Sequence, residues 1–268
     1  MSAAIDTGTD RMLATVGDGI GWVTFNNPER HNAVSLEMLR SVPAILGAFQ
    51  ADPDVRVVVM TGAGEKAFVS GADISEFGER RTSIEARAEF DEVAGRAATA
   101  WQALEKPIVA MIRGYCIGGG LGIALQADIR IAAEDSVFSI PAARLGLGYS
   151  MNAVEALVEH VGAAWAAEIL FTARRLSAEE ALRIGLVNHV VPVADLAAHV
   201  ERMAGAIAAN APLTVHACKA ALRELRHSPD TRDIDRAAAL SEACFRSEDY
   251  LEGQRAFLEK RAPRFSGR

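Results

Sequence analysis

The chain has 268 residues, a formal net charge of −7 and a hydrophobic content of 50%, which is the composition of an ordinary globular protein. A chain of this length buries enough surface to fold without disulfide bonds or a structural metal. Its acidic balance argues against a nucleic-acid partner, because phosphate binding needs clustered Lys and Arg.

The three cysteines are isolated from one another and from histidines. Cys116, Cys218 and Cys244 form no CxxC pair and no cluster with metal-ligand spacing, so we expect neither a disulfide framework nor a metal site. The first residues lack the basic start and apolar core of a signal peptide, and no apolar run reaches the length of a membrane span. These features predict a soluble, cytoplasmic protein.

Strands and helices alternate in the first two thirds of the chain. Ile20–Phe25, Val55–Met60 and Ile108–Ile112 are short apolar runs rich in β-branched residues, and each predicts a buried strand. Ser35 predicts the N-cap of a helix that Pro43 should kink or interrupt. Apolar strands separated by helices indicate an α/β fold with a mostly parallel sheet covered on both faces.

Beyond Met151 the pattern becomes helical. Ser177 and Glu180 have the spacing of a capping box, and Gly185 is a suitable stop for the helix that follows them. We therefore expect an α/β core over residues 1–200 and a helical lobe over residues 201–268. Helices are predicted over residues 84–104, 153–161, 163–170, 178–184, 193–209, 213–225, 234–245 and 247–260.

Two glycine-containing segments are the candidates for chemistry. Ala67–Ile74 reads AFVSGADI, and Gly114–Leu121 reads GYCIGGGL, with three glycines opening a predicted helix. Glycines at a helix start let a ligand approach the backbone and leave N–H groups without helical partners. Two such N–H groups aimed at one carbonyl oxygen would form an oxyanion hole. The alternative for each segment alone is a tight turn or a close helix–strand contact.

Taken in order, several sequence blocks resemble the crotonase (enoyl-CoA hydratase/isomerase) superfamily. They are PERHNAVS, AFVSGADI, KPIVAMIRGYCIGGGLGIALQADIRIA, FSIPAARLGLGYS, ALRIGLVNHVV and EGQRAFLEKRAPRF, and they cover nearly the whole chain. The resemblance implies a crotonase (ClpP-like) spiral of ββα units with a C-terminal helical trimerisation lobe. It also implies a homotrimer or dimer of trimers that acts on acyl-CoA thioesters, with coenzyme A as part of the substrate and no tightly bound cofactor.

The resemblance also assigns roles to individual positions. The backbone N–H groups of Ala72 and Gly119 should polarise the thioester carbonyl. Phe257 and Lys260 match positions that touch coenzyme A from a neighbouring subunit. The remaining expected coenzyme A contacts are Arg30, His31, Ser70, Asp73, Ile74 and Ser75.

The chain departs from the family pattern at the two positions where hydratases carry glutamates. Gly122 and Ala142 stand there, so the groups that would activate water and deliver a proton are absent, and we expect poor hydratase activity. Tyr149 and Ser150 are the candidate substitutes, and Arg144 could hold a substrate carboxylate. Isomerisation, decarboxylation of a malonyl-type thioester, and hydrolysis of a thioester or β-diketone all remain compatible with an oxyanion hole.

Two other classes of protein are weighed against this interpretation. A serine hydrolase would need a complete nucleophile elbow, but GYSMN at Gly148–Asn152 lacks its final glycine. A non-catalytic coenzyme A-binding scaffold is favoured by the absent glutamates and disfavoured by the two retained glycine segments. A buried Cys116 thiol is expected to be structural rather than nucleophilic.

Overall fold

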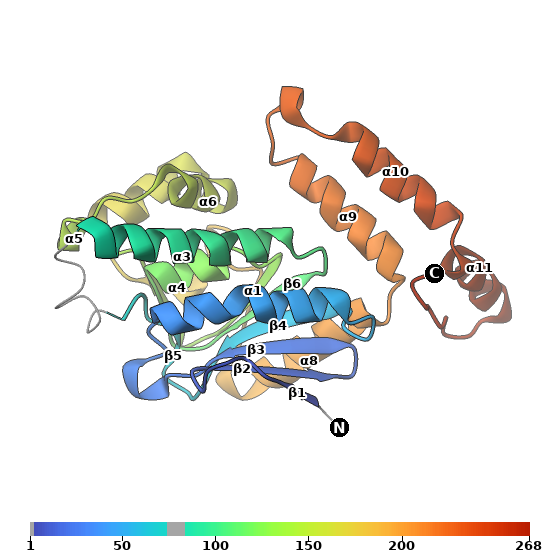
Figure 1. The fold of residues 1–268 in the computed structure, drawn as a ribbon, viewed down its shortest axis with the longest axis horizontal. Helices are drawn as coiled ribbons and strands as arrows, with labels where there is room; N and C mark the ends of the chain where they lie inside the picture. Colours follow the sequence, from blue (N-terminus) through green and yellow to red (C-terminus); the bar gives the residue numbers. More distant parts are fainter. Residues whose placement is uncertain (1–2, 74–83) are drawn as a thin grey trace.

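The computed structural model describes residues 3–73 and 84–268, and it has two sheets covered by helices (Figure 1). The larger sheet has seven strands in the order β1-β2-β3-β4-β6-β8-β11. Pairing is antiparallel from β1 to β3 and parallel from β3 to β11, as the apolar strands predicted. Its strands are β1 (Ala3–Ile5), β2 (Met12–Gly17), β3 (Ile20–Phe25), β4 (Val57–Gly62), β6 (Ile108–Ile112), β8 (Ile129–Ala133) and β11 (His189–Val191).

A second sheet of four short strands has the order β10-β9-β7-β5. Its strands are β5 (Ala67–Val69), β7 (Tyr115–Ile117), β9 (Val137–Ser139) and β10 (Leu176–Ser177). Three times in succession along the chain, one strand joins the larger sheet, the next strand joins the second sheet, and the next described helix follows. These strand pairs are β4 with β5, β6 with β7 and β8 with β9. This repetition is the spiral of ββα units that the resemblance implied.

Helices cover both faces of the larger sheet. The first residues after β11 form a 3-10 turn, Val193–Asp195, followed by α8 (Leu196–Ala208), which packs on one face; Val59 and Val109 meet Val200 there. The other face packs against α1 (Leu36–Ala51), α3 (Ile84–Ala103) and the second sheet in one continuous apolar core. Because both faces are buried, the strands are apolar at successive positions rather than alternating.

Helix α1 begins where the sequence predicted and continues where it did not. The Ser35 side chain accepts a hydrogen bond from the Met38 N–H, which confirms the N-cap. Pro43 lies inside the helix, and α1 runs through it to Ala51, so the predicted interruption is wrong. Ile45, Leu46 and Phe49, which follow Pro43, are buried in the core. Their burial stabilises the helix beyond the proline, whose cost is the loss of one backbone hydrogen bond.

The helices after β9 form a compact corner. Helix α5 (Ala142–Leu145) leads to α6 (Met151–Thr172), which Gly162 breaks with φ 75°, and then to α7 (Ala178–Arg183). The predicted separation of two helices at residue 162 is confirmed by that break. The capping box of Ser177 and Glu180 is also confirmed, as is the positive φ of Gly185.

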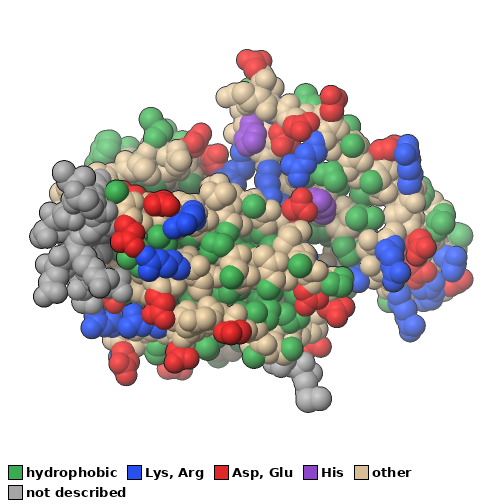
Figure 2. Space-filling model, viewed as in Figure 1, with side chains coloured by type: hydrophobic (Ala, Val, Ile, Leu, Met, Phe, Trp, Pro, Cys, Tyr) green, Lys and Arg blue, Asp and Glu red, His purple; other side chains and the backbone are tan. Residues whose placement is uncertain are grey.

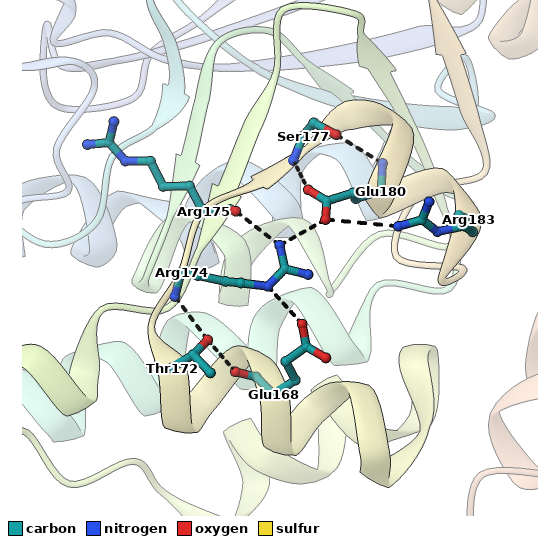
Figure 3. A network of polar contacts seen from close by, with 7 residues as sticks. All are labelled: Glu168, Thr172, Arg174, Arg175, Ser177, Glu180 and Arg183. Atoms are coloured by element: carbon teal, nitrogen blue, oxygen red, sulfur yellow. Dashed lines mark hydrogen bonds and ion pairs between the residues drawn. The ribbon is translucent and has the colours of Figure 1, made fainter.

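Arg174 holds the connection between α6 and α7 in place (Figure 3). Its guanidinium donates to Glu168 on α6 at 2.8 Å and to Glu180 on α7 at 2.8 Å. Glu180 also accepts from the Ser177 N–H at 3.0 Å, and this backbone bond together with Arg174 lowers the pKa of Glu180. The network fixes the short segment that carries β10, the edge strand of the second sheet.

The C-terminal helices project away from the sheets (Figure 1). They are α9 (Pro212–Glu224), α10 (Ile234–Phe245) and α11 (Glu248–Glu259), with a 3-10 turn at Pro229–Thr231 between the first two. The division of the chain into a core and a helical lobe remains our proposal, and by its packing on the sheet α8 belongs to the core. No helix among the described residues has both the length and the apolar character needed to cross a bilayer.

A buried lysine anchors α9 to the core. Lys219 is 6% exposed and donates to the Lys106 carbonyl at 2.7 Å and to an Asp128 carboxylate oxygen at 2.8 Å. The same oxygen accepts from the Ile108 N–H at 2.7 Å, at the start of β6. Burial lowers the pKa of Lys219 to about 8, and Asp128 opposes part of that shift.

Replacing Lys219 with methionine should reveal this ionisation in the stability of the fold. Between about pH 8 and pH 10.5 the unfolded Lys219 keeps a proton that the folded residue releases, so its contribution to the free energy of unfolding rises with pH. Across this range we expect the free energy of unfolding of the original chain to rise by up to about 3 kcal/mol relative to that of Lys219→Met. Urea denaturation at stepped pH measures it, with the exposed Lys66→Met as control. A difference in the free energy of unfolding that does not change with pH would contradict the lowered pKa of the buried Lys219.

Candidate active site

In the first glycine-containing segment, the N–H of Ala72 points away from Val34, the residue with which Ala72 forms a β-bridge. Ala72 forms an isolated parallel bridge with Val34. The Val34 N–H donates to the Gly71 carbonyl at 2.8 Å, and the Asp73 N–H donates to the Val34 carbonyl at 2.9 Å. Since backbone groups alternate direction along an extended chain, the Ala72 N–H points to the opposite side. Among the described residues, no acceptor takes its hydrogen bond.

The second segment places a further free N–H beside it. Gly119 is the first residue of α4 (Gly119–Ala124), so its N–H has no partner within the helix. The preceding Gly118 N–H donates to the Ser139 carbonyl at 2.8 Å, which fixes the turn. A methyl group built on Gly119 would lie 3.9 Å from the Ala72 nitrogen. The structure therefore brings these two predicted residues together.

Gly118 and Gly120 are required in this turn for different physical reasons. Gly118 has φ 56°, a conformation that favours glycine. A side chain on Gly120 would come within 2.0 Å of the Val69 carbonyl oxygen, so only glycine lets α4 approach β5 this closely. This contact sets the distance between the two segments and so the approach of Gly119 to Ala72.

The predicted coenzyme A contacts near residue 30 and residue 70 are neighbours. Arg30 and Asp73 form an ion pair at 3.2 Å, in which Asp73 is 5% exposed. The Ser70 N–H donates to the His31 carbonyl at 3.1 Å, and the His31 ring lies 5.8 Å from that of Tyr115, edge to face. The positions Ile74 and Ser75 lie outside the described residues.

Asn32 holds this turn together, and sequence reasoning missed it. Its side chain is fully buried, accepts from the Asn27 N–H at 2.9 Å, and donates to the carbonyls of Ala63 and Ala67 at 2.9 and 2.7 Å. These bonds connect the turn to β5, and the bridge between Val34 and Ala72 connects the same turn to the residues that follow β5. An asparagine directly before the apolar pair Ala33 and Val34 is the signal that could have identified it, because amides that become buried need partners.

A pocket of about 380 Å³ borders the same turn on another side. Its described lining includes His31, Asn32 and Lys66, together with the carboxylates of Glu29 and Glu65, but neither Ala72 nor Gly119. The pocket is therefore distinct from the point where the two amides meet.

The loop between α5 and α6 carries the candidate substitutes for the glutamates. Tyr149 packs against the main core, and burial raises its pKa, which keeps the phenol protonated and able to donate a hydrogen bond. Ser150 caps α6, since its hydroxyl accepts from the Ala153 N–H at 3.4 Å. Arg144 is exposed at the end of α5.

Phe257 and Lys260 do not join the other candidates within one chain. Both lie in or just after α11, and the Phe257 side chain is 83% exposed. Figure 1 places α11 at the opposite end of the molecule from β5, which precedes Ala72. Within this chain the two residues therefore contribute nothing to the point where Ala72 and Gly119 meet.

Cys116 is adjacent to the site but is not poised as a nucleophile. It is fully buried in β7, and burial raises the pKa of its thiol despite the opposing effect of Arg130. A thiol in this environment stays protonated and unreactive. No group of three or more potential metal ligands occurs among the residues that the structure describes.

Comparison with known proteins places this geometry among acyl-CoA enzymes. A family model described as Enoyl-CoA hydratase/isomerase matches residues 15–268. The chain is 40% identical over 243 residues to a short-chain-enoyl-CoA hydratase from Clostridium acetobutylicum, covering 89% of this chain and 91% of that protein. It is 36% identical over 252 residues to an (E)-benzylidenesuccinyl-CoA hydratase from Thauera aromatica, covering 94% and 97%.

Solved structures agree with the sequence comparisons. An enoyl-CoA hydratase/carnithine racemase from Magnetospirillum magneticum superposes with a TM-score of 0.90 at 34% identity, covering 97% of each chain. An enoyl-CoA hydratase from Bacillus anthracis superposes with a TM-score of 0.88 at 29% identity, covering 100% of this chain and 99% of that one. The similarity includes both the sheets and the C-terminal helices.

Proposed function

The chain belongs to the enoyl-CoA hydratase/isomerase (crotonase) family, whose members are acyl-CoA enzymes, and we propose that it stabilises a thioester enolate between the N–H groups of Ala72 and Gly119. The observation that supports this proposal is the approach of Gly119 to the Ala72 nitrogen, with both N–H groups unpaired among the described residues. The thioester carbonyl oxygen would accept from both. Negative charge that develops on this oxygen in the transition state would then meet two preorganised donors.

Coenzyme A would lie along the turn that joins the two segments. Arg30, His31, Ser70 and Asp73 are the described candidates for contact, and Arg30 can meet a phosphate by a charge-assisted hydrogen bond. Basic side chains also gather around α11, among them Arg255, Lys260 and Arg261 (Figure 2). In the proposed oligomer, Phe257 and Lys260 of a neighbouring subunit would complete this surface. The substrate carries the coenzyme A, and no tightly bound cofactor is proposed.

The proposed reaction does not depend on a pair of glutamates. At the positions where the family's hydratases carry them, Gly122 has no side chain and Ala142 is buried with 9% exposure. Hydration needs a base for water and an acid for the α-carbon, each of which typically contributes 10²–10⁴-fold. The protonated Tyr149 is the candidate donor, and Arg144 is the candidate partner for a substrate carboxylate.

Decarboxylation of a malonyl-type thioester is the second candidate reaction. The departing CO₂ leaves its electron pair on the α-carbon, so the enolate forms without a base. It is the reaction that the absence of both carboxylates impairs least. Isomerisation, hydrolysis of a thioester or β-diketone, and a non-catalytic scaffold are the alternatives that an assay with enoyl-, malonyl- and β-ketoacyl-CoA separates. Binding without turnover of all three would favour the scaffold.

We propose a homotrimer or a dimer of trimers, located in the cytoplasm. The helical lobe exposes large apolar side chains that a monomer would leave in water, and such patches mark interaction surfaces. They are Leu222, Leu225, Ile234, Phe245, Leu251, Phe257 and Leu258.

Gly119→Pro tests the oxyanion hole directly. Proline is well tolerated at the first position of a helix, and it removes the N–H that would hold the thioester oxygen. We expect kcat/KM for the substrate that the chain turns over to fall about 10²–10³-fold, with unchanged circular dichroism. Gly119→Ala keeps the N–H but puts a methyl group 3.9 Å from the Ala72 nitrogen, so the control is Glu248→Pro, the same change at the first position of α11, which should keep the original kcat/KM. Activity of the proline variant within threefold of the original would overturn the assignment.

Installing both carboxylates should raise the hydratase activity, which we expect to be low in the original chain. We expect crotonyl-CoA hydration, followed by the loss of enoyl-thioester absorbance, to be slow in the original chain. It should rise at least about 10-fold in the Gly122→Glu, Ala142→Glu double variant, because each group supplies one proton transfer. The two single variants are the controls, because each has only one of the two carboxylates and so can supply only one of the two proton transfers. Rapid hydration by the original chain would refute the role given to these two positions.

Charges introduced on the lobe should dissociate the assembly. Light scattering should give a mass of three or six times the 28.6 kDa chain for the original protein. The Leu251→Glu, Leu258→Glu variant should approach the mass of one chain, because burying carboxylates at an interface is costly. Leu13→Glu, on a 46% exposed residue of β2, is the matched control and should keep the original mass. A single-chain mass for the original protein would contradict the proposed oligomer.

A further inference from the structure

Gly122 is a glycine that the described fold does not require. It lies inside α4, its φ is not positive, and a methyl group built on it meets no atom of the described residues within 4 Å. Glycine in a helix interior costs about 0.8–1.0 kcal/mol relative to alanine. Alanine would therefore fit and would stabilise this helix.

Gly122 differs from the other glycines in its surroundings or in its place in the fold. Gly120, two residues earlier, would clash with the Val69 carbonyl if it carried a side chain, whereas Gly122 faces space that no described residue fills. Gly47 in α1 and Gly95 in α3 also lack neighbours, but both are exposed, so a side chain there would enter bulk water. Gly122 is partly buried, and we call the space beside it, which no described residue fills, the recess. Gly205 in α8 is likewise partly buried with no described neighbour within 4 Å, but α8 packs on the opposite face of the larger sheet.

The recess lies one helical turn from the proposed oxyanion hole. Gly119 and Gly122 are three residues apart, which puts them on the same face of α4 and about 4.5 Å apart along its axis. In a thioester whose oxygen binds the Ala72 and Gly119 N–H groups, the α-carbon stays beside the carbonyl, and the β-carbon with its substituents extends about that far. The acyl group of the substrate therefore passes the recess.

The helices next in contact with α4 carry exposed apolar side chains. Helix α4 contacts α6, and α6 contacts α5. The segment that joins α5 to α6 carries Tyr149, packed on the core, and apolar side chains that the chain leaves exposed. These are Leu145 (62% exposed), Leu147 (51%) and Met151 (78%).

We infer that Gly122 is a specificity-determining position, which admits a bulky apolar acyl group, branched or aromatic, next to the thioester. The inference rests on the proposed function, because the recess is defined by its distance from Gly119. A leucine at this position would fill the recess and exclude such a group. A short acyl chain, which does not reach the recess, would bind as before.

Binding measurements separate this inference from the identity of the reaction. The probes are acetyl-CoA, isovaleryl-CoA and phenylacetyl-CoA, titrated by calorimetry into the original chain and into Gly122→Leu. We expect the variant to lose at least about 10-fold in affinity for the two bulky thioesters, since a lost methylene contact in an apolar pocket is worth 10–200-fold, and to bind acetyl-CoA within threefold of the original.

Two control variants exclude a folding defect. Gly122→Ala should raise the midpoint of thermal unfolding, because alanine is the better helix former. Gly47→Leu, which places the same side chain on a solvent-facing helix position, should leave the ratio of the three affinities unchanged. Equal effects of Gly122→Leu on all three thioesters, or no effect on any, would overturn the specificity role. Failure of the original chain to bind any of the three would instead overturn the proposed function.

Discussion

The contact between Gly120 and β5 is the constraint on which the candidate site depends. With the Val69 carbonyl only 2.0 Å from where a Cβ would be, α4 can lie against the second sheet only if this residue is glycine. The Val34 bridge directs the Ala72 N–H, and the start of α4 leaves the Gly119 N–H unpaired. Since both donors of the proposed oxyanion hole are backbone groups, the proposed chemistry depends on how α4 packs against the second sheet rather than on a reactive side chain.

Much of the fold followed from local patterns. The buried strands, the Ser35 cap, the capping box at Ser177 and the break at Gly162 were all readable, because each depends on residues close in sequence. Pro43 misled the prediction, since burial of the residues after it outweighs one lost hydrogen bond. The split into two sheets was not predicted, because a strand of three residues, such as β5 or β7, has too few positions to show where it pairs.

The candidate site was predicted in part. Ala72 and Gly119 were named from the resemblance to a family, and their approach in space is a tertiary property that no spacing along the chain encodes. Asn32 and Val34 were missed because each acts through partners 30 or more residues away. The recess at Gly122 could not be predicted, because the sequence alone does not show whether a glycine leaves space that no described residue fills or avoids a clash with a neighbour.

The buried thiol of Cys116 provides a built-in reporter of this region. It lies in β7, two residues before Gly118, and is inaccessible in the folded chain, whereas Cys218 is exposed. A thiol reagent would therefore modify Cys218 at once and reach Cys116 only when the strand beside the glycine turn separates from its neighbours. The rate of that slow modification would measure how often the second sheet opens under native conditions.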